Sequence, residues 1–564
     1  MKMTCYQVYS AIGLTMATLL LGCRAKVNSD EECPTGDCGG VPPYNREVLV
    51  GVDNAGDPTD GPFHLIQPMK ALGVDFMVYH YWPESNLAAQ KKGLSLLGEV
   101  FDRNGLSFIL NTEIGNNREA MIDDDGWNWC VGPNSTHRFT IKPELLALAN
   151  QFKSFEGVMY DEPAHMQLNR NWIITGNGKV DKPFLGETTG LSFQEADQLV
   201  QDNAKILVDE IKAHGTKYTL TEHVFPVLFH NYAKSGMTVA YKLMKESWAP
   251  LWTACAMGAA MQYSNELWSC LDLWFAGVPG NSPMYPGHSP NELRSNLMYS
   301  YWVGNNRIYV ENLNFNESLY STESGKIELN DYGKAVRWFT HEYLPVNPRG
   351  YTYQDFKPSI AIIRFDDTDF GIANKNGFPD QLFGSRTLKS SSATREWMKV
   401  WNIVSHGVIP TPEEGISWLS YPLGTPHRSF APMNNLVVFD DNVGKKHLES
   451  LELAFVSGIS LSVQTEAALV QLVKDNGLTV VVTPKLAPAE IRAGYAGKGT
   501  QVITSGTTGG KWVVSDDFLS PMVKNNIAHL LGNDGEMRYV FGDEEIIFEI
   551  GSNDDLTVRK HKLQ

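Results

Sequence analysis

Two short stretches of the sequence run apolar and then stop on a carboxylate. Residues 157–160 lead into Asp161 and Glu162, and residues 307–310 lead into Glu311. In a parallel barrel, the carboxyl ends of the strands open onto the loops that hold a ligand, while the strands stay buried and rigid. Two carboxylates held there could cleave a sugar bond, one as acid and base, the other as nucleophile or as the group that positions water.

The residues that follow these carboxylates bear on the same chemistry. Pro163 prevents a helix from continuing at that point and favours an extended turn for its neighbour, so the side chain of Glu162 should project at the barrel mouth. Asn312 follows Glu311 and carries an amide that could bind a sugar hydroxyl. We expect Glu162 to be the acid/base and Glu311 the nucleophile. The structural alternatives are a helix cap for Glu162 and an arginine partner for Glu311.

Other polar and aromatic residues stand at or near the ends of the expected strands. Carboxylates and amides there could bind sugar hydroxyls, and aromatic faces could stack on the C–H surfaces of a sugar ring. We predict that each of these carboxylates is a binding or structural residue rather than a catalytic one. The predicted substrate-binding set is His80, Trp82, Asn111, Glu113, Asp161, Glu222, His223, Glu246, Trp274 and Asn312.

The elements that must position these residues are repeated strand–helix units. From about residue 47 to 315, apolar runs alternate with amphipathic stretches, which is typical of βα repeats. Eight units can be counted, so the sequence predicts an α/β fold with a (β/α)8 TIM barrel; an open doubly wound sheet is the alternative. The strands are expected at residues 48–53, 75–82, 107–113, 157–161, 217–223, 238–246, 267–275 and 307–312.

The second half of the chain repeats a strand and helix pattern and then changes character. Buried strands and two helices predict a doubly wound α/β domain, at residues 359–365, 436–439, 445–455 (helix), 465–476 (helix) and 478–483. A glycine-rich segment then leads into strands that predict a small antiparallel β domain, at residues 511–514, 537–541, 545–550 and 556–559. The expected domains are therefore a catalytic barrel at 46–350, an α/β accessory domain at 351–495 and a β domain at 496–564.

The first residues have the pattern of an export signal. Lys2 supplies a positive charge, and residues 11–21 are an apolar stretch too short to span a bilayer as a mature helix. This stretch runs into Cys23 in a way that resembles the lipobox of bacterial lipoproteins, which implies that residues 1–22 are removed and that Cys23 carries lipid. Residues 23–45 read as a polar tether. We expect a protein anchored by lipid in the outer membrane, facing the periplasm or the cell surface; an ordinary secretory signal is the alternative.

Composition narrows the class of partner. The chain has 564 residues, 43% of them hydrophobic, which indicates a globular protein of several domains. Its net charge of -17, with no long basic run, argues against nucleic acid and against an anionic membrane surface as partners. Motifs of serine hydrolases, zinc proteases and P-loop enzymes are missing. The cysteine spacing fits no zinc site, so we expect no metal and no cofactor, with Cys130, Cys255 and Cys270 as buried thiols.

The order of barrel, α/β domain and terminal β module resembles the architecture of family 42 β-galactosidases and of glycoside hydrolase family 164, both retaining enzymes of clan A. In that clan the acid/base glutamate ends strand four, usually after an asparagine; Glu162 matches this place, with Asp161 in the asparagine position. The clan's nucleophile normally ends strand seven. In our count Glu311 ends strand eight and Asp272 lies within strand seven, which leaves either the count or the nucleophile open. The resemblance also implies a homo-oligomer, such as the trimer that family 42 enzymes form.

The sequence thus predicts a retaining β-glycosidase that acts on an oligo- or polysaccharide outside the inner membrane. A glycan-binding lipoprotein that kept the barrel and lost the chemistry is the first alternative, and an inverting enzyme on the same fold is the second. A hydrolase needs two carboxylates that converge on one pocket, whereas a binding protein needs only aromatic and neutral hydrogen-bonding groups.

Overall fold

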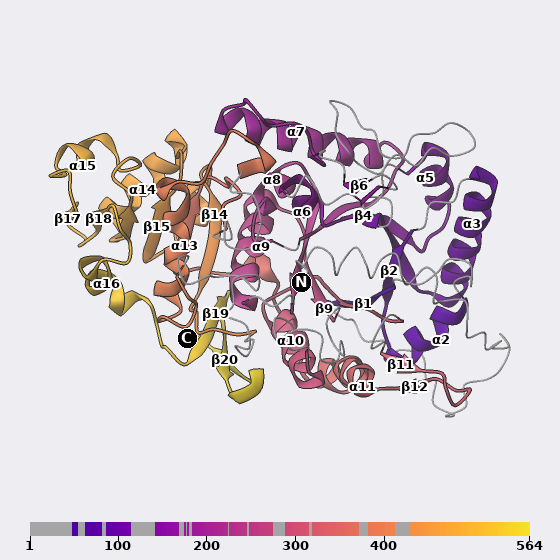
Figure 1. Cartoon of the computed structure of the whole chain (residues 1–564). Coiled ribbons are helices and arrows are strands. Elements are labelled where there is room, and N and C mark those ends of the chain that lie inside the picture. Colours follow the sequence, from indigo (N-terminus) through magenta and orange to yellow (C-terminus); the bar gives the residue numbers. More distant parts are fainter. Residues whose placement is uncertain are drawn as a thin grey trace, which may run out of the picture.

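Eight parallel strands close into a barrel in the first half of the chain (Figure 1). The computed structural model describes residues 48–54, 63–81, 86–113, 141–168, 174–175, 178–179, 183–223, 225–244, 248–273, 288–314, 319–370, 382–411 and 429–563. The barrel strands are β1 (Leu49–Asn54), β2 (Phe76–His80), β3 (Ser107–Asn111), β4 (Phe155–Asp161), β7 (Tyr218–His223), β8 (Thr238–Leu243), β9 (Leu267–Asp272) and β10 (Arg307–Glu311). Parallel pairing of β10 with β1 closes the barrel. The predicted (β/α)8 barrel is confirmed, and the open sheet is excluded.

The strand count is also settled by this topology. β10 is the eighth barrel strand and ends at Glu311, while β9 is the seventh and ends at Asp272. Several strands stop earlier than the sequence pattern predicts: β2 ends at His80 and β3 at Asn111, so Glu113 lies beyond its strand, at the start of the next turn of helix. The apolar pattern continues into these loops because loop residues at the barrel mouth are also buried.

Helices follow the strands and cover the outside of the barrel. They are α2 (Phe63–Leu72), α3 (Leu87–Asn104), α5 (Pro143–Ala149), α6 (Pro163–Leu168), α7 (Phe193–Lys212), α8 (Phe229–Lys234), α9 (Ala249–Tyr263), α10 (Pro290–Trp302) and α11 (Asp331–Trp338). Their ends follow from local sequence. The Asn86 side chain accepts hydrogen bonds from the first turn of α3, Gly105 ends that helix in a left-handed conformation, and Ser192 and Glu195 form a capping box on α7.

The interior of the barrel is filled by apolar side chains from alternate strand positions. Successive residues of a strand point to opposite faces, so every second residue faces inward. These inward residues form a core of their own, separate from the larger core between strands and helices: Phe76, Val78, Ile109, Met159, Leu220, Ala240, Trp268, Cys270 and Tyr309. Cys255 and Cys270 are buried free thiols, as expected.

Beyond residue 350, the described chain forms two further sheets. The first has six strands in the order β14 (Leu436–Asp440), β13 (Ile360–Arg364), β15 (Leu453–Ser457), β16 (Thr479–Val482), β18 (Lys511–Ser515) and β17 (Thr500–Thr504). Only β17 runs antiparallel to its neighbour. Around this sheet lie α13 (Ser392–Val404), α14 (Val463–Asn476), α15 (Ala489–Ala493) and α16 (Pro521–Ile527). A three-stranded antiparallel sheet follows, made of β19 (Glu536–Phe541), β20 (Glu544–Ile550) and β21 (Leu556–Lys562).

Two predicted elements in this half were wrong. The stretch 445–455, expected as a helix, contains only a short 3-10 turn and then enters strand β15, because a short apolar run does not distinguish a buried strand from a buried helix. The strand at 511–514, expected in the terminal β domain, is β18 and belongs to the six-stranded sheet, which extends to residue 515.

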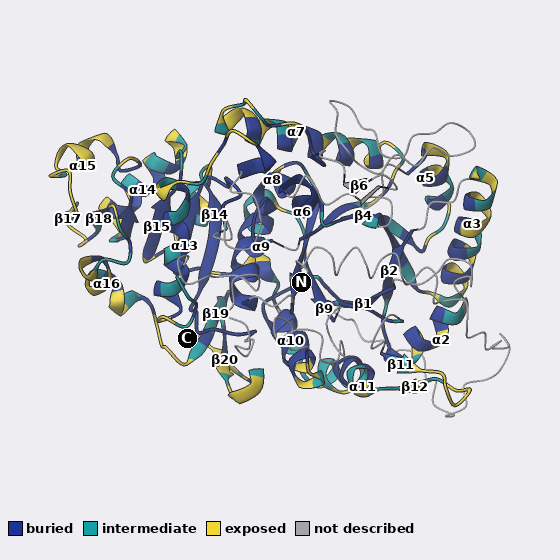
Figure 2. Ribbon diagram, in the orientation of Figure 1, coloured by how far each residue is buried: buried dark blue, intermediate teal, exposed yellow. Residues whose placement is uncertain are grey.

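Helix α9 joins the barrel to the six-stranded sheet. It is buried from Ala249 to Ala260, and Figure 2 shows it as a dark blue helix between the barrel and β14. A Cβ at Gly258 would lie 1.6 Å from the carbonyl oxygen of Val438, so only glycine allows this close approach. In the part of the chain that the structure describes, no helix combines the length and the hydropathy that crossing a membrane requires.

Candidate active site

Each of the eight barrel strands places one buried polar side chain at its carboxyl end, and together these form what we call the polar ring. Each member stands two residues beyond an inward-facing residue of the barrel core, or, on β1, beyond Gly51, which faces the ring of Phe76. The period of two therefore turns these side chains inward as well. The polar ring consists of Asp53, His80, Asn111, Asp161, Glu222, Lys242, Asp272 and Glu311.

Lys242, on the sixth barrel strand, is the centre of one side of the polar ring. Its ammonium nitrogen lies 2.7 Å from Glu222 Oε1, 3.0 Å from Glu311 Oε2, 3.4 Å from Glu162 Oε1 and 3.6 Å from Asp272 Oδ2. Sequence reasoning missed this residue because a single lysine in a strand usually faces solvent. The period of two from the inward-facing Ala240 is the signal that would have found it.

Glu162 and Glu311 converge on this lysine. Their contacts of 3.4 and 3.0 Å with the same nitrogen cannot place the two carboxylate oxygens more than about 6.4 Å apart. Retaining glycosidases hold their carboxyl groups about 5–5.5 Å apart, and inverting enzymes about 6.5–9.5 Å. This upper bound is compatible with the separation that a retaining enzyme needs.

Glu162 stands just outside the polar ring, between β4 and α6. Its backbone has a φ of 48°, and its N–H donates to the carbonyl of Glu222 on the neighbouring strand. The predicted extended turn before Pro163 is wrong: the residue is left-handed, and Pro163 begins a short helix. A left-handed non-glycine residue is held there only by its surroundings, a feature that concentrates at functional sites. The second carboxylate oxygen lies 3.2 Å from His165 Nδ1.

Glu311 is the deeper of the two carboxylates. Its Oε2 contacts Lys242 and lies 3.6 Å from the thiol sulfur of Cys270. Burial, followed by the negative charge of Asp272, raises the pKa of Glu311 well above its usual range, and Lys242 opposes this shift. The neighbouring Glu222 also accepts a hydrogen bond from the hydroxyl of Tyr309, and burial raises its pKa against the effect of Lys242.

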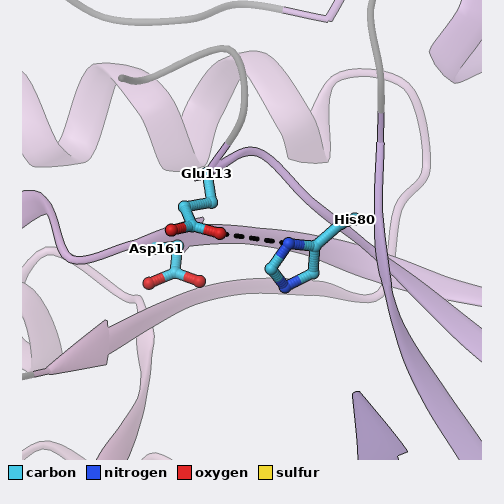
Figure 3. A group of neighbouring side chains, drawn as sticks. All are labelled: His80, Glu113 and Asp161. Atoms are coloured by element: carbon cyan, nitrogen blue, oxygen red, sulfur yellow. Dashed lines mark ion pairs between the residues drawn. The ribbon is translucent and has the colours of Figure 1, made fainter. Parts of the chain in front are cut away.

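His80 stands on β2, opposite the strand of Lys242 in the barrel. Figure 3 shows His80 with its ion pair to Glu113 and with Asp161 nearby. Its Nε2 lies 2.9 Å from Asp53 and its Nδ1 lies 3.1 Å from Glu113. Burial lowers the pKa of His80, but the carboxylates of Asp53 and Glu113 outweigh burial and raise the pKa well above its usual value. The imidazole has a carboxylate on each nitrogen, and this arrangement favours its protonated form.

Asp161 lies beside this group and is oriented by Asn111. The amide of Asn111 donates to Asp161 Oδ2 over 2.7 Å, while its carbonyl accepts from the backbone of Glu113 over 2.8 Å. Burial, followed by the negative charge of Glu222, raises the pKa of Asp161 well above its usual range. Asp161 therefore favours its protonated form more than an exposed aspartate does.

Among the described residues, two groups of side chains have donor atoms close enough to hold a metal ion. They are His80, Glu113 and Asp161, and Glu222, Cys270 and Glu311, with donor atoms within 4.8 Å of one another in each group. In the second group, the ammonium of Lys242 already contacts Glu222 and Glu311. In the first, His80 is ion-paired with Glu113.

Of the remaining residues predicted to bind substrate, one lies beside Glu311, one points away from the polar ring, and three lie outside the described residues. Asn312 is buried next to Glu311, and neither polar atom of its side chain has a hydrogen-bond partner among the described residues. His223 does not reach the polar ring: strand alternation turns it outward, where it stacks on Phe229 at 4.1 Å, and burial lowers its pKa to about 3. Three predicted residues lie outside the described part of the chain: Trp82, Glu246 and Trp274.

The arginine that could have partnered Glu311 lies elsewhere. Arg307 is at the other end of β10, where it pairs with Glu156 and lies over the ring of Trp268. It therefore closes the base of the barrel. The cation at Glu311 is Lys242.

Comparison with known proteins gives similar folds and no relative in sequence. Neither a family model nor a curated protein matches the sequence. A family 42 exo-carrageenase from Bacteroides ovatus aligns at 9% identity over 98% of this chain and 83% of that chain, with a TM-score of 0.46. The catalytic module of a family 98 glycoside hydrolase from Streptococcus pneumoniae TIGR4 aligns at 9% identity over 90% and 73%, with a TM-score of 0.43.

An HpcH/HpaI aldolase from Desulfitobacterium hafniense DCB-2 also aligns, at 10% identity over 47% of this chain and 86% of that chain, with a TM-score of 0.24. The similar structures thus include glycoside hydrolases and an enzyme of another class. One barrel fold hosts many unrelated reactions. The function of this chain has to be inferred from the side chains of its own site.

Proposed function

We propose that this protein is a retaining β-glycosidase in which Glu162 is the acid/base and Glu311 the nucleophile. The observation that carries the proposal is the meeting of these two carboxylates at Lys242. They come from opposite walls, because three strands separate β4 from β10 in either direction around the barrel. A sugar bound at this mouth would have one carboxylate near its anomeric carbon and the other near the glycosidic oxygen.

The first half of the reaction transfers the sugar to the protein. An oxygen of ionised Glu311 attacks the anomeric carbon while protonated Glu162 gives its proton to the glycosidic oxygen, so the leaving alcohol departs neutral. Glu162 suits the role of the acid beside the leaving group because its side chain is 21% exposed, whereas that of Glu311 is 8% exposed. The departing group can therefore leave past Glu162, while Glu311 keeps the glycosyl ester away from bulk water.

The second half returns the nucleophile. Glu162, now ionised, removes a proton from a water molecule, and the water oxygen attacks the anomeric carbon and breaks the ester to Glu311. The product keeps the anomeric configuration of the substrate because two displacements have occurred. Asn312, next to Glu311, would bind a hydroxyl of the same sugar ring; the support is that its buried amide has no hydrogen-bond partner among the described residues.

Asp272 supports a second mechanism on the same site. It ends strand seven, where the clan nucleophile normally stands, and lies 3.6 Å from Lys242. If Asp272 or Glu311 instead positioned a water molecule on the far face of the sugar, the enzyme would invert configuration. The non-catalytic alternative would leave the converging carboxylates without a role.

The test is a panel of aryl β-glycosides and oligosaccharides with the mature protein, with the product anomer identified by NMR. Hydrolysis with retention supports the proposal, and hydrolysis with inversion replaces it by the second mechanism. Binding of glycans without any turnover would favour the non-catalytic protein. Glu144→Gln is the matched control for glutamate replacement, because Glu144 is exposed on α5.

We also propose that the protein acts outside the inner membrane, attached by a lipid on Cys23. The support is the sequence pattern that ends in Cys23 and the polar tether that follows. Mass spectrometry of the N-terminal peptide should find acylated Cys23 and no residue before it, and Cys23→Ser should move the protein out of the membrane fraction. An unmodified Cys23 on a protein that does not sediment with membranes would contradict this part of the proposal.

A further inference from the structure

We propose that Lys242 is the positioning residue of this site: as an ammonium it opposes protonation of Glu311 and fixes the spacing of Glu162 and Glu311. The inference rests on the proposed function for its catalytic part. Its electrostatic part rests only on the contacts within the polar ring.

Lys242 is buried and forms ion pairs with Glu222 and Glu311. Lys242 is 2% exposed, and a buried ammonium is stable only when carboxylates surround it. Among the described residues, no other Lys, Arg or His forms an ion pair with Glu222 or with Glu311. His80 instead serves Asp53 and Glu113, on the other side of the polar ring. Within the described part of the chain, the cation that pairs with Glu222 and Glu311 is therefore one side chain, that of Lys242.

The charge balance around Lys242 is a further argument. Besides each other, Lys242 and Glu311 interact with groups from four strands and from the residue after β4, all of them acidic or neutral: Asp53, Asp161, Glu162, Glu222, Cys270 and Asp272. Like charges this close favour protonation of one another. Without Lys242, Glu311 would take up a proton and could no longer attack carbon.

The environment also decides what Lys242 itself can do. A lysine that forms a Schiff base needs a lowered pKa, so that it is an amine at neutral pH. Burial lowers the pKa of Lys242, but Glu222, Glu311 and Asp272 outweigh burial and raise the pKa well above its usual value. Lys242 is thus an ammonium, suited to hold carboxylates in place and unsuited to attack a carbonyl carbon.

Two substitutions test the inference by moving the pH profile in opposite directions. The acidic limb of kcat/KM reports ionisation of the nucleophile in the free enzyme. Lys242→Met should move this limb to higher pH and lower kcat at neutral pH by about 100-fold or more, with partial recovery in alkali. Glu222→Gln, which removes a negative neighbour, should move the limb to lower pH. Lys242→Arg, which keeps the charge, should leave the limb near its wild-type position.

A merely structural lysine would give a different pattern. Loss of activity in Lys242→Met by the same factor at every pH would overturn the inference, as would a shift in Glu222→Gln toward higher pH. Glu222→Gln also keeps the test decisive if Lys242→Met fails to fold. Trapping of Lys242 by borohydride in the presence of a small ketone would overturn the assignment of a charged ammonium.

A second readout needs no turnover and separates this inference from the proposed function. In Lys242→Met the uncompensated carboxylates bind protons on folding, so the Tm difference from wild type should be largest near pH 8 and shrink toward pH 5. If the wild-type protein has no glycosidase activity but the Tm difference still shrinks toward pH 5, the proposed function is wrong. The electrostatic role of Lys242 then stands. A Tm difference that does not change with pH would overturn the electrostatic role itself.

Discussion

Glu311 and Asp272 are register partners at the carboxyl ends of neighbouring strands, and both carboxylates contact the ammonium of Lys242, at 3.0 and 3.6 Å. The nucleophile of the clan that the sequence resembles would stand at Asp272, and the residue that the sequence pattern favours is Glu311. The structure places the two side by side. Under the proposed function either carboxylate could be the nucleophile, and labelling of the nucleophile distinguishes them.

We predict that Glu311 is the nucleophile. Glu311→Gln should lower kcat by about 10⁴-fold or more and abolish labelling by a 2-fluoro glycoside, because the ester can no longer form. Asp272→Asn should still form the labelled ester, only more slowly. Mass spectrometry of the labelled peptide gives the answer directly, and a label on Asp272 in the wild-type protein would reverse the assignment.

For Glu162 we predict an effect that depends on the leaving group. Glu162→Ala should lower kcat by about 10²–10⁴-fold for substrates with alkyl or sugar leaving groups, because these need a proton to depart. Substrates with activated aryl leaving groups should be affected much less in the first step. Rates for a series of leaving groups, with Glu144→Gln as the control, would show the difference; equal losses for all substrates would contradict the role.

We predict that Asp161→Asn makes the protein more stable. Its pKa is raised in the folded state, first by burial and then by Glu222, so its folding contribution declines as pH rises above its ordinary pKa of 3.8. Asp161→Asn removes this decline and can still accept the hydrogen bond from Asn111. Urea unfolding should give a free-energy advantage to the variant that grows from about pH 5 to about pH 8. An advantage that shrinks with rising pH would show that Asp161 gains stability from ionisation.

Two glycines in helices should respond to alanine with opposite signs. Gly258 of α9 has the carbonyl of Val438 1.6 Å from where a Cβ would lie, so Gly258→Ala should destabilise the protein by about 1–3 kcal/mol or more. Gly93 of α3 has no atom within 4 Å of that position, so Gly93→Ala should stabilise the helix by about 0.5–1 kcal/mol. Unfolding free energies of the two variants test the packing of α9 on β14. A neutral Gly258→Ala would mean that the sheet and the barrel lie further apart.

Much of the barrel was determined by local pattern. Eight apolar runs separated by amphipathic stretches are enough to predict parallel strands and covering helices, because burial on both faces of a strand leaves a continuous apolar sequence. Two of these apolar runs end at Glu162 and Glu311, and this located the candidate site. Polar side chains can stand at the carboxyl end of a barrel strand because that end opens onto the loops.

Tertiary structure alone decided which polar side chains share the site. Glu222 and His223 are adjacent in sequence, yet strand alternation sends Glu222 to Lys242 and His223 to the helices outside, and the direction of that alternation is fixed only when the barrel closes. Strand alternation from Ala240 can turn Lys242 inward, but local sequence cannot supply its partners, because the carboxylates that it contacts lie between 20 and 80 residues away in the chain. A buried charge is stable only if the folded chain places charges of opposite sign beside it. The register of the barrel strands decides which side chains these are.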